Sequence, residues 1–256
     1  MKTFGLIGYP LGHSFSAAFF NEKFSREGIN AVYTNFPMQS VSELRTLITT
    51  RPDLCGLNVT IPHKQNVIPL LDALSPMAQR VGAVNVIAIK HSQAMPDGIF
   101  LKGYNTDVIG FTESLRPLLK PCHTSALVLG TGGAARAVIA ALENLKLSVQ
   151  CVSRHAQTHF CGAPVCTWDS LTADDVASHT VIINCTPLGM SPHTDAMPPI
   201  PFEPLTSTHI VFDLIYNPEE TCLLRHARQQ GATTQNGLQM LHLQALAAWD
   251  IWNSHD

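Results

Sequence analysis

The polar side chains that could do chemistry lie at the ends of apolar, strand-like segments. In GLNVTIPHKQ, residues 56–65, apolar residues alternate with Asn58 and Thr60, and Lys64 follows shortly after a proline. The alternation predicts a strand with Asn58 and Thr60 on one face. Ligands of open α/β sheets collect at the carboxyl ends of the strands, so we expect Lys64 to lie beside a small-molecule site.

Other small polar groups follow strand-like segments in the same way. Ser14 and Ser16 lie in GHSFS, directly after the first such segment. Asn85 follows a glycine in GAVNVI, and Asp107 lies at a predicted helix start in YNTDVIGF. These hydroxyls and amides, with one amine and one carboxylate, suit a hydroxylated small molecule that carries a carboxylate.

Lys64 and Asp107 together suit the reduction of a ketone. Hydride delivery builds negative charge on the ketone oxygen, and an ammonium stabilises that charge and can supply the proton. A neighbouring carboxylate holds the lysine and favours its charged form. Alone, Lys64 is typical of an exposed helix lysine and Asp107 of a charge at a helix N-terminus. The whole set of residues favours the catalytic interpretation.

A glycine turn in ALVLGTGGAARAVIAAL predicts a dinucleotide site. Gly130, Gly132 and Ala135 match the G-x-G-x-x-G/A pattern between an apolar strand and a helix. The first glycine allows a tight turn, and the second lets a pyrophosphate approach the helix N-terminus. A plain strand-to-helix turn is the alternative, but the context on both sides favours the dinucleotide.

The end of the following strand-like segment favours NADP over NAD. An NAD site uses an acidic residue there, but the chain has no Asp or Glu between Glu143 and Asp169. Ser153, Arg154 and His155 occupy the position instead. A guanidinium there suits a 2′-phosphate, although a solvated surface arginine is common.

Strand-like and helix-like segments alternate along the chain and predict an α/β protein of two domains. The prolines at 117 and 121 mark a break, after which a new alternation starts at residue 125. Two strands, 84–90 and 98–103, are expected to meet through a turn at Pro96-Asp97-Gly98. Residues 237–252 predict a long final helix, and the proline-rich stretch 191–204 a surface loop.

Composition excludes several classes of function. The 256 residues carry a formal net charge of -3 without a run of Lys or Arg, which argues against a nucleic-acid partner. Seven cysteines without a C-x-x-C pair suit reduced thiols in the cytoplasm. We expect no membrane span, because no stretch of about 18 apolar residues occurs. The N-terminal segment is too short and rich in glycine for a signal peptide.

The motifs together resemble the shikimate dehydrogenase family. They occur in the family's order over nearly the whole chain: GYPLGHSFS (8–16), GLNVTIPHK (56–64), GAVN (82–85), GYNTD (103–107), GTGGAARA (130–137), NCTPLGM (184–190), DLIYNPEETCLL (213–224) and GLQMLHLQA (237–245). The resemblance implies NADP-dependent, reversible reduction of 3-dehydroshikimate to shikimate, on the route to chorismate and the aromatic amino acids. The sequence leaves the oligomeric state open between a monomer and a homodimer.

The resemblance further implies a fold and a set of site residues. An N-terminal α/β substrate domain with a mixed sheet, residues 1–102 with 238–256, is expected beside a Rossmann-type NADP domain, 103–237, with the final helix packing back on the first domain. The implied catalytic pair is Lys64 and Asp107. The implied substrate residues are Ser14, Ser16, Asn58, Thr60, Lys64, Asn85, Asp107, Tyr216 and Gln244. The implied cofactor residues are Gly130, Thr131, Gly132, Gly133, Ala134, Ser153, Arg154, His155, Thr186, Leu214, Gly237 and Met240.

The adenine end departs from the family. Relatives often carry a second basic residue four positions after the arginine, where this chain has Thr158. NAD use and activity on quinate therefore remain alternatives, although quinate-preferring relatives often carry threonine in place of Ser16. A cofactor-binding regulator without turnover is a third alternative, which the intact Lys64 and Asp107 disfavour.

A metal site is the remaining alternative. His155, His159, Cys161 and Cys166 are possible zinc ligands by type. Their spacing matches no standard structural zinc pattern, and they overlap the expected cofactor site. We therefore expect no metal.

Overall fold

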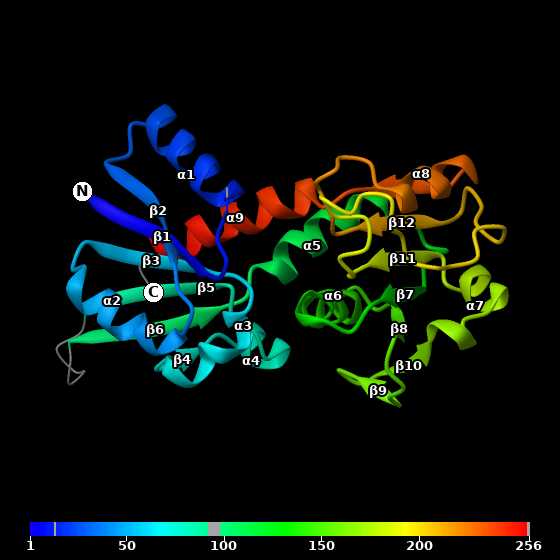
Figure 1. The fold of residues 1–256 in the computed structure, drawn as a ribbon, viewed down its shortest axis with the longest axis horizontal. Helices are drawn as coiled ribbons and strands as arrows, with labels where there is room; N and C mark the ends of the chain where they lie inside the picture. The colour runs from blue at the N-terminus through cyan, green and yellow to red at the C-terminus, as the bar shows by residue number, and fades with distance from the viewer. Residues whose placement is uncertain (13, 92–97, 255–256) are drawn as a thin grey trace. The chain divides into compact units, whose positions relative to one another are not determined.

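The computed structural model describes residues 1–12, 14–91 and 98–254 (Figure 1). It divides into two compact units. The first unit comprises Met1–Thr106 with Ala245–Asp256, and the second comprises Asp107–Gln244. Each unit has its own sheet, so the fold is α/β throughout.

The first unit is built on a six-stranded mixed sheet in the order β2-β1-β3-β5-β6-β4. Its strands are β1 (Lys2–Gly8), β2 (Ala31–Pro37), β3 (Leu54–Val59), β4 (Ala73–Leu74), β5 (Val86–His91) and β6 (Ile99–Tyr104). β1 pairs in parallel with β2 and β3, whereas β5 runs antiparallel to β3 and β6. The carboxyl ends of β1 and β3 and the start of β5 therefore meet at one edge of the sheet.

Short helices connect these strands. They are α1 (Phe15–Arg26), α2 (Leu44–Thr50), α3 (His63–Asn66) and α4 (Pro76–Val81), with 3₁₀ turns η1 (Val41–Glu43) and η2 (Ile68–Leu70). Ser14 caps α1, because its hydroxyl oxygen accepts a hydrogen bond from the Ala17 amide at 3.4 Å. α1 thus begins directly after the loop that follows β1.

An aromatic cluster closes one face of this sheet. Phe4 of β1 stacks on Trp252 with ring centroids 4.9 Å apart, and the Trp252 indole N–H donates to the Ile87 carbonyl at 3.1 Å. Trp252 lies on α9 (Leu238–Asn253). A Cβ at Gly56 would collide with the indole, so glycine makes room for this ring. The end of α9 therefore belongs to the core of the first unit.

The second unit is built on a seven-stranded sheet in the order β13-β12-β11-β7-β8-β10-β9. The strands are β7 (Ser125–Leu129), β8 (Ser148–Ser153), β9 (His159–Phe160), β10 (Ala163–Thr167), β11 (Val181–Asn184), β12 (Ile210–Asp213) and β13 (Thr233–Gln235). All pairings are parallel except that between β9 and β10. This is a Rossmann-type sheet with a change of direction at one edge.

Helices cover both faces of the second sheet. They are α5 (Asp107–Leu115), α6 (Gly133–Asn144), α7 (Ala173–Ser178), α8 (Cys222–Gln229) and the start of α9, with 3₁₀ turns η3 (Arg116–Leu118) and η4 (Trp168–Ser170). Leu223 of α8 shares a buried cluster with Val211 of β12. Phe111 of α5 contacts the neighbouring Phe212, with centroids 5.1 Å apart, and so packs on the opposite face.

The α/β class and the mixed first sheet are confirmed, and part of the second sheet was missed. β5 and β6 pair as expected, while Pro96 and Asp97 of the predicted turn lie outside the described residues. The stretch 154–179 contains β9, β10 and α7, none of which was predicted from the sequence. These elements are two to six residues long, too short to carry a clear period of two or 3.6. Within the described part of the chain, no helix is long and apolar enough to cross a membrane.

Candidate active site

The expected substrate residues of the first unit line one edge of its sheet. Asn58 lies near the end of β3, and the Thr60 amide donates to the Ile7 carbonyl at the end of β1 at 2.9 Å. Asn85 immediately precedes β5. Asn58 and Asn85 are 5% and 3% exposed. The sheet topology thus brings these two amides together.

Buried hydrogen bonds fix the two asparagine amides. The Asn58 Nδ2 donates to the Asn85 carbonyl at 3.3 Å. The Asn85 Nδ2 donates to Thr106 Oγ1 at 3.0 Å, and the Thr106 amide donates back to Asn85 Oδ1 at 2.7 Å. Buried amides that find such partners are held in one orientation. The edge is therefore preorganised before any ligand binds.

Ser14 and Ser16 lie at the N-terminus of α1. Ser14 is the N-cap, and Ser16 lies in the first turn. The first amides of a helix have no intrahelical acceptor and carry partial positive charge. Two hydroxyls beside such amides suit a carboxylate.

Lys64 lies in the first turn of α3 and is half-buried. Its own carbonyl accepts a hydrogen bond from the Val84 amide at 2.7 Å, which ties α3 to the segment before Asn85. The adjacent His63 is buried, and its Nε2 lies 2.5 Å from the Met38 carbonyl. The backbone that carries the amine is thus anchored on two sides.

Asp107 begins α5 and is also half-buried. It belongs to the second unit and Lys64 to the first. Their pairing therefore stays a prediction from the sequence.

The glycine turn of the second unit leaves open space where a pyrophosphate would bind. Gly130 has φ +101°, a conformation that favours glycine, and its amide donates to the Val152 carbonyl at 2.8 Å. Gly132 is the N-cap of α6 with φ −86°. A Cβ at Gly132 or Gly133 would meet no atom within 4 Å. The N-terminus of this 12-residue helix fits a phosphate group.

The expected adenosine end lies at the end of β8. Ser153 is buried, its hydroxyl lies 3.1 Å from that of Thr131, and it accepts from the His155 amide at 3.2 Å. These bonds join the glycine turn to the loop after β8. Arg154 and His155 are both exposed. The guanidinium is therefore accessible to an anionic ligand.

A second cation near this loop was missed from the sequence. Arg136, in the first turn of α6, lies over the Phe160 ring at 5.1 Å, and its Nη1 donates to Cys161 Sγ at 3.7 Å. Its spacing from the glycine turn was a signal, since Arg136 follows Gly133 by three residues. What could not be predicted was that β9 places Phe160 beneath it.

The expected nicotinamide end is organised by a buried carboxylate. Asp213, at the end of β12, is 0% exposed. Its Oδ2 accepts from Thr221 Oγ1 at 2.7 Å, and its Oδ1 accepts from Asn184 Nδ2 at 3.0 Å. The Asn184 Oδ1 in turn accepts from the Thr186 amide at 2.9 Å and its hydroxyl at 2.7 Å. Burial raises the pKa of Asp213 to about 6, although the hydrogen bonds from Thr221 and Asn184 act to lower it.

Gly237 brings the start of α9 against the end of β12. Its amide donates to the Ile215 carbonyl at 3.0 Å, and a Cβ there would collide with the Leu214 carbonyl. Met240 follows in the first turn of α9. The structure thus gathers Thr186, Leu214 and Gly237 at one end of the sheet. Tyr216 follows Leu214 by two residues and is exposed. Gln244 lies on α9 and is buried.

Residues 6–87 match a family model described as the shikimate dehydrogenase substrate binding domain. The chain is 37% identical to the shikimate dehydrogenase (NADP(+)) of Desulforamulus reducens, over 97% of this chain and 88% of the relative. It is 36% identical to that of Methanosphaera stadtmanae, over 97% and 90%. The chain belongs to the shikimate dehydrogenase family.

Solved structures of shikimate dehydrogenases have the same fold. One in complex with NADP+ is 35% identical, with a TM-score of 0.86 over 98% of this chain and 90% of the other. That of Thermus thermophilus with NADP(H) and shikimate is 31% identical, with a TM-score of 0.84 over 99% and 94%. A 5-ketofructose reductase of a Gluconobacter species is 29% identical, with a TM-score of 0.84 over 98% and 92%.

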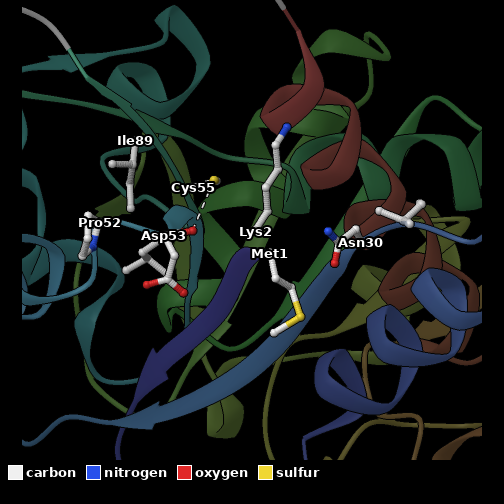
Figure 2. A pocket seen from close by; sticks show the side chains of 9 residues that line it. Met1, Lys2, Asn30, Pro52, Asp53, Cys55 and Ile89 are labelled. Atoms are coloured by element: carbon white, nitrogen blue, oxygen red, sulfur yellow. Dashed lines mark hydrogen bonds between the residues drawn. The ribbon is translucent and has the colours of Figure 1, made fainter.

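Two cavities lie away from the residues expected of a shikimate dehydrogenase. One of about 540 Å³ opens at the start of β1 and β3 and is lined by Lys2, Asp53 and Cys55, among others (Figure 2). The Cys55 thiol donates to the Asp53 carbonyl at 3.4 Å, and Arg51 pairs with the Asp53 carboxylate at 3.2 Å. Asp53 and Cys55 thus have partners within the protein, and the cavity is at the opposite end of the strands from Asn58.

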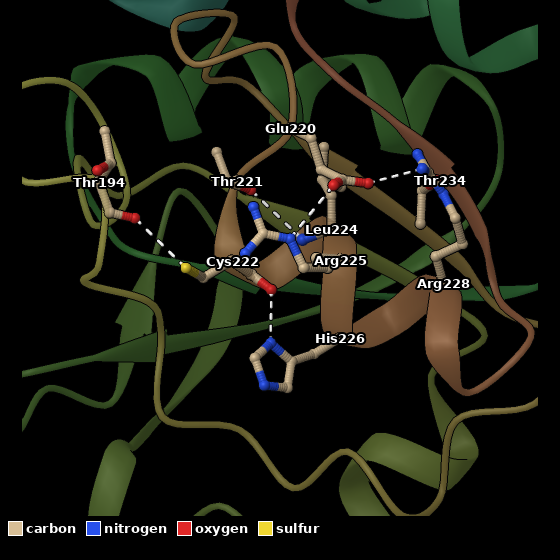
Figure 3. A network of polar contacts seen from close by, with 9 residues as sticks. All are labelled: Thr194, Glu220, Thr221, Cys222, Leu224, Arg225, His226, Arg228 and Thr234. Carbon is tan, nitrogen blue, oxygen red and sulfur yellow. Dashed lines mark hydrogen bonds and ion pairs between the residues drawn. The ribbon is translucent and has the colours of Figure 1, made fainter.

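The second cavity, of about 410 Å³, lies between α8 and β13. Figure 3 shows Glu220 facing Arg225 and Arg228, while the Cys222 thiol donates to the Thr194 carbonyl at 3.4 Å. The Arg228 Nη1 lies 2.6 Å from Glu220 Oε1. The Glu220 carboxylate thus pairs with the guanidinium groups of Arg225 and Arg228. The Cys222 thiol ties the loop at Thr194 to α8.

Proposed function

We propose that the chain catalyses the reversible, NADP-dependent reduction of 3-dehydroshikimate to shikimate. The observation that carries this is the preorganised edge of the first sheet, where Asn58, Asn85 and Thr106 form a buried hydrogen-bonded row. Such a row suits a ligand with several hydroxyls, because a site built to hydrogen-bond hydroxyls rejects analogues that lack them. The reaction itself is inferred from membership in the shikimate dehydrogenase family.

Substrate recognition divides between a carboxylate end and a hydroxyl end. The hydroxyls of Ser14 and Ser16 at the start of α1 bind the shikimate carboxylate, supported by the helix amides. The side chains of Asn58, Thr60, Asn85, Asp107 and Gln244 bind ring hydroxyls, and Tyr216 lies near the substrate. The first unit therefore supplies most of the substrate site, and we assign residues 1–102 and 238–256 to substrate binding and 103–237 to NADP binding.

Lys64 and Asp107 act as the catalytic pair in this proposal. The cofactor supplies or accepts the hydride. In the reduction, the Lys64 ammonium stabilises the oxygen that gains charge and donates a proton to it. The carboxylate of Asp107 holds the amine and opposes its loss of charge on desolvation. In the oxidation of shikimate, the neutral amine accepts the hydroxyl proton.

The second unit holds NADP at the carboxyl ends of β7, β8, β11 and β12. The cofactor fits here because the turn Gly130–Ala134 leaves open space at the N-terminus of α6. Ser153, Arg154 and His155 bind the 2′-phosphate, and Arg136 supplies positive charge nearby. Thr186, Leu214, Gly237 and Met240 surround the nicotinamide. A solved relative from Listeria monocytogenes contains shikimate and NAD, and the assay therefore compares the two cofactors.

The deciding experiment is an absorbance assay of the reduced nicotinamide with shikimate and quinate, each with NADP and with NAD. We expect the fastest turnover with shikimate and NADP. A preference for quinate would identify the related activity instead, and 5-ketofructose tests the activity of the structural neighbour. Cofactor binding without turnover of any substrate would indicate a regulator and overturn the proposal.

The proposed partners are small molecules only, in a cytoplasmic enzyme that is a monomer or homodimer. Light scattering of the purified protein distinguishes these two states.

A further inference from the structure

Tyr33 joins two residues of the substrate edge and has no role in the site described above. It lies on β2 with its side chain 3% exposed. Its hydroxyl donates to Asn58 Oδ1 at 2.7 Å in a buried hydrogen bond. The Ser16 side chain lies near this hydroxyl, close enough to lower its pKa against the effect of burial. One phenol thus binds a proposed hydroxyl residue and lies near a proposed carboxylate residue.

The hydrogen bonds at Asn58 have a fixed direction. An amide oxygen only accepts, so Tyr33 must be the donor, and the Asn58 Nδ2 must face the Asn85 carbonyl at 3.3 Å. A flipped amide would lose both bonds. One Nδ2 hydrogen goes to Asn85, so the other is the one that Asn58 can offer to a ligand.

Packing fixes the phenol itself. The Tyr33 ring stacks on Phe20 of α1, with centroids 4.9 Å apart and planes 11° apart. Asn21 of α1 binds both backbone groups of Tyr33: its Oδ1 accepts from the Tyr33 amide and its Nδ2 donates to the Tyr33 carbonyl, each at 2.9 Å. These contacts hold α1, the helix that carries Ser16, in a fixed position relative to Tyr33.

Burial keeps the phenol protonated. Desolvation raises the pKa of Tyr33 far above its ordinary value. The hydroxyl therefore keeps the one proton that it donates to Asn58, so the Ser16 hydroxyl is the donor in any hydrogen bond between Ser16 and Tyr33.

We propose that Tyr33 is a positioning residue for substrate recognition. Its hydroxyl holds the Asn58 amide in the orientation that presents Nδ2 to a ring hydroxyl, and it couples that amide to Ser16 at the carboxylate end. This inference rests on the proposed function of the same edge.

The test is Tyr33→Phe, which removes one oxygen and keeps the stacked ring. We expect KM for shikimate to rise about 10-fold, kcat to change less than about 3-fold, and KM for NADP to stay unchanged, because one buried hydrogen bond is lost on the substrate side only. Tyr9→Phe is the matched control, since its exposed hydroxyl accepts from Gln39 at 3.0 Å. Unchanged kinetics in Tyr33→Phe, or equal losses for substrate and cofactor, would overturn the proposal.

A double-mutant cycle with Ser16→Ala and Asn58→Ala tests the coupling without altering Tyr33. We expect the combined effect on KM for shikimate to differ from the product of the single effects by at least about 3-fold, which corresponds to a coupling through a shared partner. Multiplicative effects would contradict the coupling. If the wild-type protein did not turn over shikimate, the proposed function would fail. If the wild type turned over shikimate and Tyr33→Phe had the same kinetics as the wild type, only the inference about Tyr33 would fail.

Discussion

Lys64 is carried by a helix of only four residues, yet its backbone is well anchored. The Val84 amide binds its carbonyl, and the buried His63 beside it contacts Met38. Replacing the side chain should therefore disturb chemistry rather than folding. Lys64 differs from an ordinary exposed helix lysine because its side chain is half-buried and its backbone is tied to Val84.

We predict that Lys64→Ala lowers kcat by about 10²-fold or more with little change in KM for shikimate, because the amine acts mainly in the transition state. Steady-state kinetics of shikimate oxidation measure this. Lys120→Ala is a suitable control. A defect confined to KM would make Lys64 a binding residue.

Arg154 is exposed, and we predict that it sets the preference for NADP. Arg154→Ala should raise KM for NADP by about 10-fold or more and leave NAD kinetics nearly unchanged, because a charge-assisted contact to the 2′-phosphate is lost. Arg136→Ala should give a smaller loss. Arg154→Ala should also flatten the salt dependence of NADP binding. Equal effects of Arg154→Ala on both cofactors would leave it a surface residue.

Asp213 should make stability depend on pH in an unusual direction. Its pKa in the folded protein is raised to about 6, above the ordinary value of 3.8, so the fold favours the neutral form. The folded state then binds more protons than the unfolded state between these values. Stability from Asp213 is therefore full below about pH 4 and is lost as the pH rises through about 6.

We predict that the free energy of unfolding of the wild type, relative to Asp213→Asn, falls by about 3 kcal/mol between about pH 4 and about pH 7, from a shift of about two pKa units. Urea denaturation across this range measures it. Asp175→Asn is the control of opposite sign, because hydrogen bonds from Thr172 lower the pKa of Asp175. Its contribution should be lost as the pH falls. A flat difference for Asp213 would contradict the prediction.

Among the structural elements, the glycine turn contains two glycines that are needed for different reasons, one for its backbone conformation and one for the space that it leaves for the cofactor. Gly130 needs its positive φ, whereas a Cβ at Gly132 meets nothing. Gly132→Ala should therefore fold normally.

We predict that Gly132→Ala keeps the melting temperature of the wild type but weakens NADP binding by about 10-fold or more, because the added methyl occupies the approach of the pyrophosphate. Gly130→Ala should instead lower the melting temperature, since alanine is strained at φ +101°. Thermal melts and cofactor titrations distinguish the two. Normal cofactor binding by Gly132→Ala would mean that the turn is only structural.

The strands and helices that could be predicted are those with a clear period and a polar residue at the end. β1, β3, β7 and α6 are of this kind, and their ends carry most of the proposed site. The two-residue β9 carries no such pattern, so the neighbourhood of Arg136 could not be foreseen. Tyr33 also escaped prediction, because nothing local distinguishes a tyrosine whose hydroxyl reaches Asn58, 25 positions along the chain.

At the scale of the whole molecule, the described residues contain no group of three or more His, Cys, Asp or Glu side chains arranged to hold a metal. Burial also raises the pKa of the Cys161 thiol, which disfavours the thiolate that zinc requires. We predict that elemental analysis of the purified enzyme finds no stoichiometric zinc and that chelators leave its activity intact. One zinc per chain would contradict this and return attention to His155 and His159.

The two units differ in how the chain builds them. The second unit uses one continuous stretch, residues 107–244, whereas the first takes residues 1–106 and then 245–256. Trp249 and Trp252, which pack on its aromatic cluster, follow the second unit in the chain and are therefore synthesised after it. We therefore expect the first half of the chain, although it is made first, to leave this aromatic cluster incomplete and exposed until residues 245–252 can pack on it.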